Sequence, residues 1–364
     1  MRLGGDQRLS GLVAAIKIVV LLYVFLLSIA LLGTSFKAFG SGFAKQLVES
    51  TSNPFLGLMI GVIVTSLVQS SSVTTSLIVG LVGGGALSLQ SAIPMVMGAN
   101  IGTTVTNMLV SLGQIGRKDD FRRAFSAAVV HDTFNVITVA ILFPIQIKFN
   151  LLGRSAEFLS RMFVGVSGAK FSSPIKIVVK PAADLIDAVV GGNPWMLIII
   201  AGILLFVSLN YLVKTLKSVV VSRVQVFFDR VIFKNAAISL VFGLVVTVMV
   251  QSSSITTSLV VPLAGAGLLN LWQVLPYTLG ANVGTTVTAI LASMATGEAS
   301  AVTVAFAHLL FNVFGIIIIW PFRIVPIRVA EYAATLAVKN RMFPIAFVVV
   351  FFYAIPLGIV LLTR

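Results

Sequence analysis

The sequence contains no cysteine, only two histidines and few charged residues, which make up 10% of its 364 positions. The lack of cysteine excludes disulfides, thiol nucleophiles and cysteine metal sites, and two histidines are too few for a histidine-rich metal centre. A soluble domain carries about 25% charged residues, whereas here 58% of residues are hydrophobic and the mean hydropathy is +1.08. We therefore exclude a soluble enzyme, a disordered chain and a disulfide-rich domain, and predict an all-α polytopic membrane protein.

The chain also has little negative charge, which leaves a net charge of +14. In a soluble protein this excess would suggest nucleic acid as a partner. Here the basic residues lie between apolar stretches, where they set the topology of membrane spans. We therefore expect membrane lipid, and no nucleic acid, around this protein.

Long stretches without charge mark the candidate spans, because about 20 residues cross a bilayer as a helix. Four runs are close to this length: 18–36, 188–213, 299–322 and 342–363. The runs 50–116 and 235–297 are too long for one span, and each is interrupted near its middle by Gly, Ser and Thr. The stretch 124–147 is also apolar, except for His131 and Asp132 near its start.

The chain repeats itself. The segment QSSSVTTSL at 69–77 returns as QSSSITTSL at 251–259, and GANIGTTVT at 98–106 returns as GANVGTTVT at 280–288, both at an offset of 182. AVVHDTFN, which ends at Asn135, matches AFAHLLFN, which ends at Asn312, at an offset of 177. Such internal symmetry is typical of a transporter built from two halves.

The charges of equivalent loops differ in sign. The loop 116–123 carries four basic residues, whereas its counterpart 295–300 carries only Glu298. Because positive charge stays on the cytoplasmic side, the two loops should face opposite sides, and we predict inverted repeats with a cytoplasmic N-terminus. The basic residues of 148–193 conflict with this orientation, but long loops obey the rule poorly, and part of that segment has the apolar spacing of a helix lying on the membrane surface.

Each half then has the same predicted order. A span is followed by two short apolar segments joined at QSSS, which we interpret as a re-entrant helical hairpin with QSSS at its tip, then by an interrupted helix and an unbroken one. The resulting organisation is a tail at 1–10, repeat 1 at 11–147 with hairpin 54–88 and interrupted helix 91–112, an amphipathic linker at 148–192, repeat 2 at 193–321 with hairpin 236–270 and interrupted helix 273–294, and an amphipathic segment with a last span at 322–364.

The QSSS clusters are the strongest candidates for a functional site. One Ser in a membrane helix usually bonds back to its own backbone, but four consecutive polar side chains point around the whole helix, and some would face lipid at a cost of several kcal/mol. Each cluster must therefore break the helix or line a polar cavity. Hydroxyl and amide groups both donate and accept hydrogen bonds, and a helix restarting after QSSS offers free N–H groups to an anion. Neither long run contains Lys or Arg, so a bound anion would need co-bound cations.

The GANxGTT segments form a second candidate set. Gly98, Gly102, Gly280 and Gly284 permit either a helix break or close helix packing. The accompanying amides and hydroxyls exceed what packing requires, and together with exposed carbonyls they could form a sodium site. These residues are Asn100, Thr103, Thr104, Thr106, Asn282, Thr285, Thr286 and Thr288.

Asp132 is the only carboxylate within an apolar span of either repeat, and its counterpart is Leu309. Intramembrane acids are usually functional, so we expect Asp132 to be a cation ligand, unless it sits in water at the cytoplasmic end. His131 and His308 are expected to make structural hydrogen bonds rather than to relay protons.

Paired QSSS motifs, each followed by GANxGTT and AxxHxxFN, resemble the type II sodium-dependent phosphate cotransporters over residues 11–321. The resemblance implies a compact prokaryotic member in the inner membrane that takes up sodium and inorganic phosphate together by alternating access, without a cofactor or catalytic activity. It also implies phosphate contacts from Gln69, Ser70, Ser71, Ser72, Gln251, Ser252, Ser253 and Ser254. Sodium contacts are implied for Thr74, Thr75, Asn100, Thr103, Thr104, Asp132, Thr256, Thr257, Asn282, Thr285 and Thr286, with Asp132 at the position tied to an extra sodium.

Other functions are less well supported by the sequence. A sodium-coupled transporter of another tetrahedral oxyanion, such as sulfate or arsenate, would use the same donors. A membrane-embedded phosphatase or lipid transferase would need a base or metal cluster near the Ser runs, where only His131, His308 and Asp132 are available. A passive anion channel would show no cation dependence. The sequence leaves the oligomeric state open, a homo-oligomer included.

Overall fold

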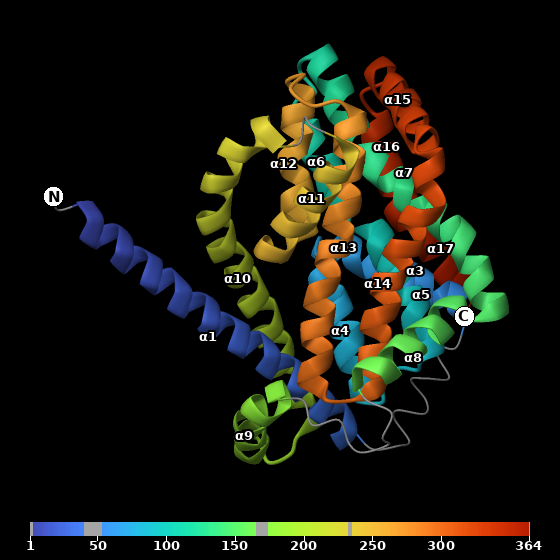
Figure 1. Cartoon of the computed structure of the whole chain (residues 1–364). Helices are drawn as coiled ribbons and strands as arrows, with labels where there is room; N and C mark the ends of the chain where they lie inside the picture. The colour runs from blue at the N-terminus through green and yellow to red at the C-terminus, as the bar shows by residue number, and fades with distance from the viewer. Residues whose placement is uncertain (1–2, 40–52, 165–173, 232–234, 364) are drawn as a thin grey trace.

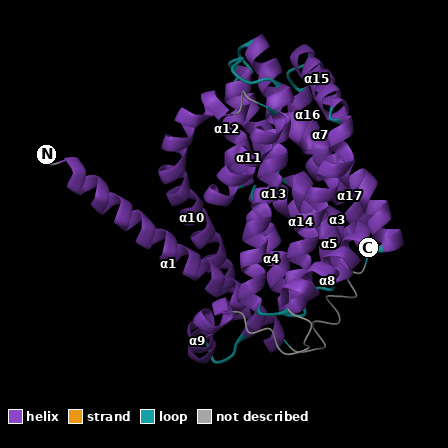
Figure 2. Ribbon diagram, viewed as in Figure 1, coloured by secondary structure: helices purple, strands orange, loops and turns teal. Residues whose placement is uncertain are grey.

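We describe a computed structural model of the chain, which covers residues 3–39, 53–164, 174–231 and 235–363. Every regular element in these ranges is a helix (Figure 2). Within them, six helical stretches are long and apolar enough to cross a membrane: Leu12–Ala38, Lys118–Phe149, Pro194–Ser218, Leu271–Thr296, Ala299–Phe322 and Phe343–Leu362. The predicted all-α polytopic class is therefore confirmed.

The first half of the chain contains α1 (Leu3–Ala38), α3 (Pro54–Val68), α4 (Ser71–Gly83), α5 (Leu89–Gly102), α6 (Val105–Leu112) and α7 (Lys118–Phe149). Two connecting helices follow, α8 (Leu151–Val164) and α9 (Pro174–Val189). The second half contains α10 (Pro194–Val231), α11 (Ala236–Val250), α12 (Ser253–Gly265), α13 (Leu271–Thr296) and α14 (Ala299–Ile319). The chain ends with η1 (Trp320–Phe322), α15 (Ile324–Lys339), α16 (Phe343–Val349), the π-helical turn η2 (Val350–Ala354) and α17 (Ile355–Leu362).

Two helix pairs, α3–α4 and α11–α12, occupy the predicted hairpins, and each pair breaks at its QSSS motif. Both pairs begin in the same way, because Asn53 caps α3 and its repeat counterpart Asn235 caps α11 with a side-chain oxygen. The α4 helix then leads toward the lower end of the view in Figure 1, whereas α12 leads toward the upper end. Equivalent arms thus run toward opposite ends of the molecule.

The interrupted helices differ between the two halves. The first is interrupted as predicted, since α5 ends at Gly102 and α6 begins at Val105. The second prediction is wrong, because α13 continues without a break through the whole of 273–294. The side chains at this point also differ: the Thr104 hydroxyl at the first break lies 2.8 Å from an oxygen of Asp132, whereas the second half has Leu309 at the position of Asp132.

Glycines bring each hairpin very close to the helix that follows it. A Cβ on Gly98 would overlap the carbonyl oxygen of Leu58 in α3, and a Cβ on its counterpart Gly280 would overlap the carbonyl oxygen of Leu240 in α11. The reverse contact, from Gly61 onto α5, has the same tightness. The GANxGTT glycines therefore serve close packing of backbone on backbone, which small residues permit in membrane helices.

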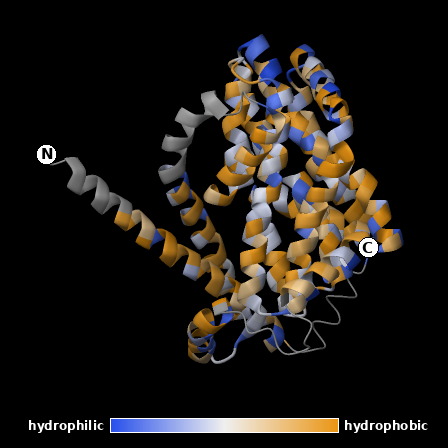
Figure 3. Cartoon of the chain, viewed as in Figure 1, coloured by the Kyte–Doolittle hydropathy of each residue, from blue (hydrophilic) through white to orange (hydrophobic). Residues whose placement is uncertain are grey.

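The peripheral helices each pack one face against the central helices. The predicted amphipathic segment forms α8, which buries Leu152 and Ala156 while Phe158 and Met162 remain exposed. Helix α15 packs on α7, and α1 packs on α10. The N-terminal part of α1 projects away from the bundle (Figure 1), and apolar residues predominate along the helices in the view of Figure 3. Large apolar side chains on the outer helices are exposed, among them Ile199, Ile203 and Ile317. This distribution is that of helices surrounded by lipid.

Candidate functional site

The two QSSS turns have the same backbone conformation. Gln69 and Gln251 end their helices in the left-handed region, with φ of 54° and 57°. The backbone N–H of each glutamine donates to the carbonyl oxygen of the threonine four residues earlier, at 2.7 Å. The left-handed conformation costs about 1–2 kcal/mol for a residue with a side chain. The strain recurs at equivalent positions, which is typical of a site whose geometry matters for function.

A serine restarts the helix after each turn. Ser70 accepts a hydrogen bond from the Val73 N–H at 3.3 Å, and its counterpart Ser252 accepts one from the Ile255 N–H at 3.4 Å. These N-caps are the arrangement that free backbone donors of a helix start require. The N-termini of α4 and α12, which are the positive ends of their helix dipoles, therefore both lie at the tips, where an anion would be stabilised.

The two tips contact each other reciprocally. The Ser72 hydroxyl donates to the carbonyl oxygen of Gln251 at 3.2 Å, and the Ser254 hydroxyl donates to the carbonyl oxygen of Gln69 at 3.3 Å. The structure thus brings together the eight residues of the two QSSS motifs, which lie 182 positions apart in the chain. Such an exchange of identical contacts is characteristic of a two-fold relation between two similar surfaces.

The threonines after each tip turn back to the tip backbone. Thr74 and Thr75 donate to the carbonyl oxygens of Ser70 and Ser71 at 3.2 and 2.8 Å. Thr256 and Thr257 donate to the carbonyls of Ser252 and Ser253 at 3.1 and 2.7 Å. All four threonines are buried, so their hydroxyl oxygens stand beside carbonyl oxygens, as a hard cation requires.

The GANxGTT residues lie in the same buried region but bond mostly within their own helices. Asn100, Thr103, Thr285 and Thr286 all donate to carbonyls three or four residues back. Asn282 is different, since its amide donates to Asn135 at 2.9 Å and its oxygen lies 2.7 Å from His131. Of these predicted sodium residues, Asn282 is the one that joins the two repeats through its side chain.

Asp132 is buried in α7, with 2% of its surface exposed. Its partner is the Thr104 hydroxyl at 2.8 Å, and the same hydroxyl lies 2.8 Å from the Ile101 carbonyl. The alternative that Asp132 sits in water at the end of its span is therefore wrong. A buried carboxylate beside a hydroxyl and a carbonyl is a suitable cation ligand.

Two further residues outside the predicted phosphate and sodium sets belong to this polar region: Thr288, which the sequence grouped with the GANxGTT hydroxyls, and Asn107, which was missed. Thr288 donates to the Gln251 side-chain oxygen at 2.8 Å, which fixes that amide at the tip. The Asn107 side-chain oxygen lies 3.0 Å from the Thr257 hydroxyl, which it shares with the Ser253 carbonyl, and the Asn107 amide nitrogen lies 3.2 Å from His131. Asn107 could have been found as an amide within an apolar span, but its counterpart is Ala289, so a search guided by the repeat passed over it.

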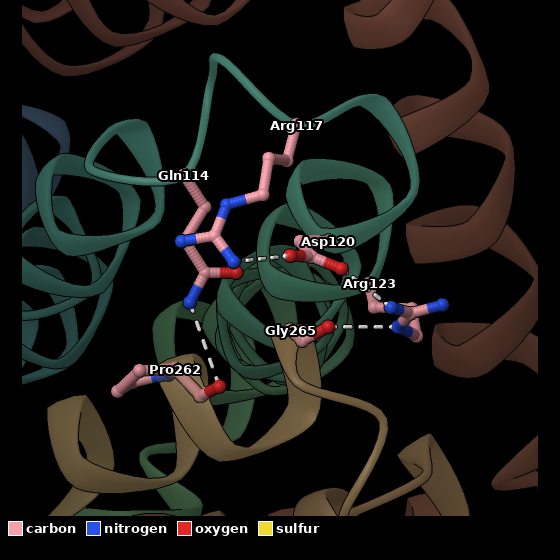
Figure 4. Close-up of polar contacts among 6 residues, drawn as sticks. All are labelled: Gln114, Arg117, Asp120, Arg123, Pro262 and Gly265. Carbon is pink, nitrogen blue, oxygen red and sulfur yellow. Dashed lines mark hydrogen bonds and ion pairs between the residues drawn. The ribbon is translucent and has the colours of Figure 1, made fainter.

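The C-terminal end of α12 is hydrogen-bonded to the basic segment 116–123, most of which forms the start of α7 (Figure 4). Arg123 donates to the carbonyl oxygen of Gly265 at 2.8 Å and pairs with Asp120 at 2.7 Å, and Asp120 also pairs with Arg117. A cation at a helix C-terminus is favourable. Within the described residues, no three His, Asp or Glu side chains gather as a group that could hold a metal ion.

The sequence of this chain is similar to those of known proteins. A sequence profile described as Na+/Pi-cotransporter matches residues 24–170 and 204–322. Sodium-dependent phosphate transport protein 2B of Homo sapiens is 31% identical over an alignment that covers 96% of this chain and 65% of the relative. Protein 2A of Rattus norvegicus is 33% identical, with coverage of 92% and 65%.

The chain spans 65% of the length of these curated relatives. No solved structure was found to match it. The profile match includes both tips, the GANxGTT segments and the AxxHxxFN motifs. The chain therefore belongs to the Na+/Pi-cotransporter family.

Proposed function

We propose that this protein is a sodium-coupled symporter that imports inorganic phosphate across a prokaryotic inner membrane by alternating access. The observation that carries the proposal is the meeting of two equivalent tips through reciprocal contacts of Ser72 and Ser254. Their hydroxyls, with the starts of α4 and α12, would donate to a tetrahedral oxyanion from two sides. The names of the relatives support phosphate as that anion.

Phosphate in this site would replace the two cross-tip hydrogen bonds with bonds to its own oxygens. We assign phosphate binding to Gln69, Ser70, Ser71, Ser72, Gln251, Ser252, Ser253 and Ser254. No Lys or Arg lies in either charge-free run that holds the tips, so sodium ions would offset the anion charge. Each ion would then raise the affinity for the other, as thermodynamic linkage requires.

We assign sodium to oxygens of the residues that surround the tips. Asp132 provides the one carboxylate, and hydroxyl and amide oxygens provide the rest. The proposed set is Thr74, Thr75, Asn100, Thr103, Thr104, Asp132, Thr256, Thr257, Asn282, Thr285 and Thr286. The asymmetry of Asp132 and Leu309 makes the two halves unequal as cation sites.

Inverted repeats would explain the opposite directions of equivalent helices and the different charges of equivalent segments. The arms α4 and α12 lead in opposite directions from the tips (Figure 1), and the basic loop 116–123 has an almost uncharged counterpart at 295–300. We propose that both hairpins are re-entrant, with the tips near the bilayer centre and the N-terminus in the cytoplasm. Rocking of one repeat against the other would open the tips to each side in turn.

The experiment that tests this function is uptake of labelled phosphate into proteoliposomes. An inward sodium gradient should drive saturable uptake, and potassium or choline gradients should not. Uptake without sodium dependence would contradict the proposal and indicate a proton-coupled or passive pathway. Competition with sulfate and arsenate in the same vesicles distinguishes a phosphate transporter from one for another tetrahedral oxyanion, which is the alternative that the same donors permit.

A further inference from the structure

A chain of buried hydrogen bonds connects the second hairpin to the first repeat. The Thr257 hydroxyl of α12 lies 3.0 Å from the Asn107 side-chain oxygen of α6. The Asn107 amide nitrogen lies 3.2 Å from Nδ1 of His131 in α7, and Nε2 of His131 lies 2.7 Å from the side-chain oxygen of Asn282 in α13. All four residues are at most 4% exposed.

The directions of these bonds determine the proton on the histidine. An amide nitrogen can only donate, so with Asn107 oriented in this way Nδ1 of His131 must accept. The ring then carries its proton on Nε2 and donates it to the Asn282 oxygen at 2.7 Å. The Asn135 amide nitrogen lies 3.3 Å from the same Nε2 but donates to the Asn100 carbonyl at 3.0 Å. Asn282 in turn donates to Asn135 at 2.9 Å, so both ends of its amide are fixed.

The equivalent positions of the other repeat lack this chain. The counterparts of Asn107, His131 and Asn282 are Ala289, His308 and Asn100. Asn100 donates within its own helix to Val96. Neither ring nitrogen of the buried His308 has a hydrogen-bond partner among the described residues. The two halves share their fold and the burial of these histidines, so the fold does not require this chain of hydrogen bonds. It is specific to Asn107 and His131 of the first repeat.

We propose that His131 and Asn107 are positioning residues for sodium, which hold Asn282 and the Thr257 hydroxyl in the orientation that the cation uses. The inference rests on the proposed function, because it takes Thr257 and Asn282 as sodium ligands. Neither His131 nor Asn107 needs to touch the ion. Loss of Asn107 leaves the Thr257 hydroxyl with the Ser253 carbonyl as its partner, and loss of His131 leaves Asn282 held by Asn135 at one end of its amide. The cation site then loses part of its order, while the phosphate tips keep their own caps.

The test measures two constants for each variant in proteoliposomes: the sodium concentration for half-maximal uptake at saturating phosphate, and the phosphate KM at saturating sodium. Asn107→Ala gives the first repeat the residue that the second already has, and His131→Leu removes the ring. Each should raise the sodium constant about threefold to tenfold, the effect of one hydrogen bond, and leave the phosphate KM within about twofold. The conservative His131→Gln should lie closer to the unchanged protein than His131→Leu.

Two controls separate positioning from simple packing. His308→Leu removes an equally buried histidine that takes no part in this chain of hydrogen bonds. The sodium constant of this variant should not change. The double variant Asn107→Ala/His131→Leu should have a sodium constant no higher than that of the more affected single variant. The reason is that the two residues belong to the same chain of hydrogen bonds and act as a unit. Equal sodium effects at His131 and His308, or parallel changes in both constants, would overturn the proposal.

A binding measurement without transport covers variants that carry out no uptake. Sodium, compared with potassium and without phosphate, should raise the Tm of the detergent-solubilised protein, since a ligand of the folded state stabilises it. Asn107→Ala should need a higher sodium concentration for the same rise. If sodium stabilises the protein in this way but drives no phosphate uptake, the proposed function fails and the positioning role stands. If Asn107→Ala responds to sodium like the unchanged protein, the positioning role fails.

Discussion

At the scale of single residues, the two tips depend on hydroxyl groups that serve different purposes. The Ser254 hydroxyl reaches across to Gln69, whereas Ser258, one turn further along α12, bonds back to Ile255 of its own helix at 2.8 Å. Only the first is free to exchange its partner for an anion. The position of a serine relative to the helix start therefore decides whether its hydroxyl bonds to its own helix or reaches a neighbouring segment.

Ser254→Ala should raise the phosphate KM about threefold to tenfold, because one hydroxyl donor to the anion is lost. Ser258→Ala is the matched control, with the same substitution in the same helix, and should leave the KM within about twofold. Initial rates of phosphate uptake at saturating sodium give both values. Equal KM values for the two variants would argue against the tip as the phosphate site.

Asp132→Asn should reduce the net charge moved per phosphate. The substitution keeps the shape of the side chain and its contact to Thr104 but removes the charge that favours a cation. The ratio of current to phosphate flux in voltage-clamped membranes measures the effect, provided that the unchanged protein moves charge. A ratio equal to that of the unchanged protein would show that Asp132 has a structural role.

At the scale of helices, glycines determine how closely each hairpin approaches the following helix. Gly280→Ala should lower the free energy of unfolding by about 1–3 kcal/mol, since overpacking forces the backbone apart and the new Cβ meets the Leu240 carbonyl. Gly202→Ala is the control: that glycine lies in α10 with nothing within 4 Å of its Cβ position, and Ala favours a helix. Thermal unfolding of the solubilised protein compares the two, and similar Tm values would contradict the close packing.

The helices also show how far the sequence predicts the fold. Runs without charge predicted the long apolar helices, because the bilayer excludes charge and requires a minimum length. The same reasoning failed at α13, where GANVGTT predicted a break that the structure lacks. A glycine pattern cannot distinguish a break from close packing. The side chain opposite differs between the halves, Asp132 in one and Leu309 in the other, and the contact of Asp132 with Thr104 is visible only in three dimensions.

The candidate site was predicted to a similar extent. The sequence singled out the eight tip residues because four adjacent polar side chains have no simple place in a membrane helix, and the structure brings the two clusters into contact. Asn107 was missed because its role depends on Thr257, which lies 150 positions away. Short-range patterns identify polar clusters, whereas the links between them depend on how the helices pack.

At the scale of the whole molecule, the absence of cysteine allows a direct test of the proposed inversion. Ser88 and Asn270 are equivalent positions, each capping the helix that follows its hairpin, and both are accessible to solvent. If the repeats are inverted, these two caps face opposite sides of the membrane. Ser88→Cys and Asn270→Cys each place a single thiol in a chain that has no other.

A membrane-impermeant thiol reagent added outside sealed vesicles of uniform orientation should therefore modify only one of the two variants. The other should react after the vesicles are permeabilised, which shows that its thiol is intact and accessible. From the charge of the loop 116–123, Asn270→Cys should be the cytoplasmic one, because this loop and α12 meet through Arg123 and Gly265. Modification of both from the same side would exclude the inversion, and with it an alternating-access mechanism based on exchange between two inverted halves.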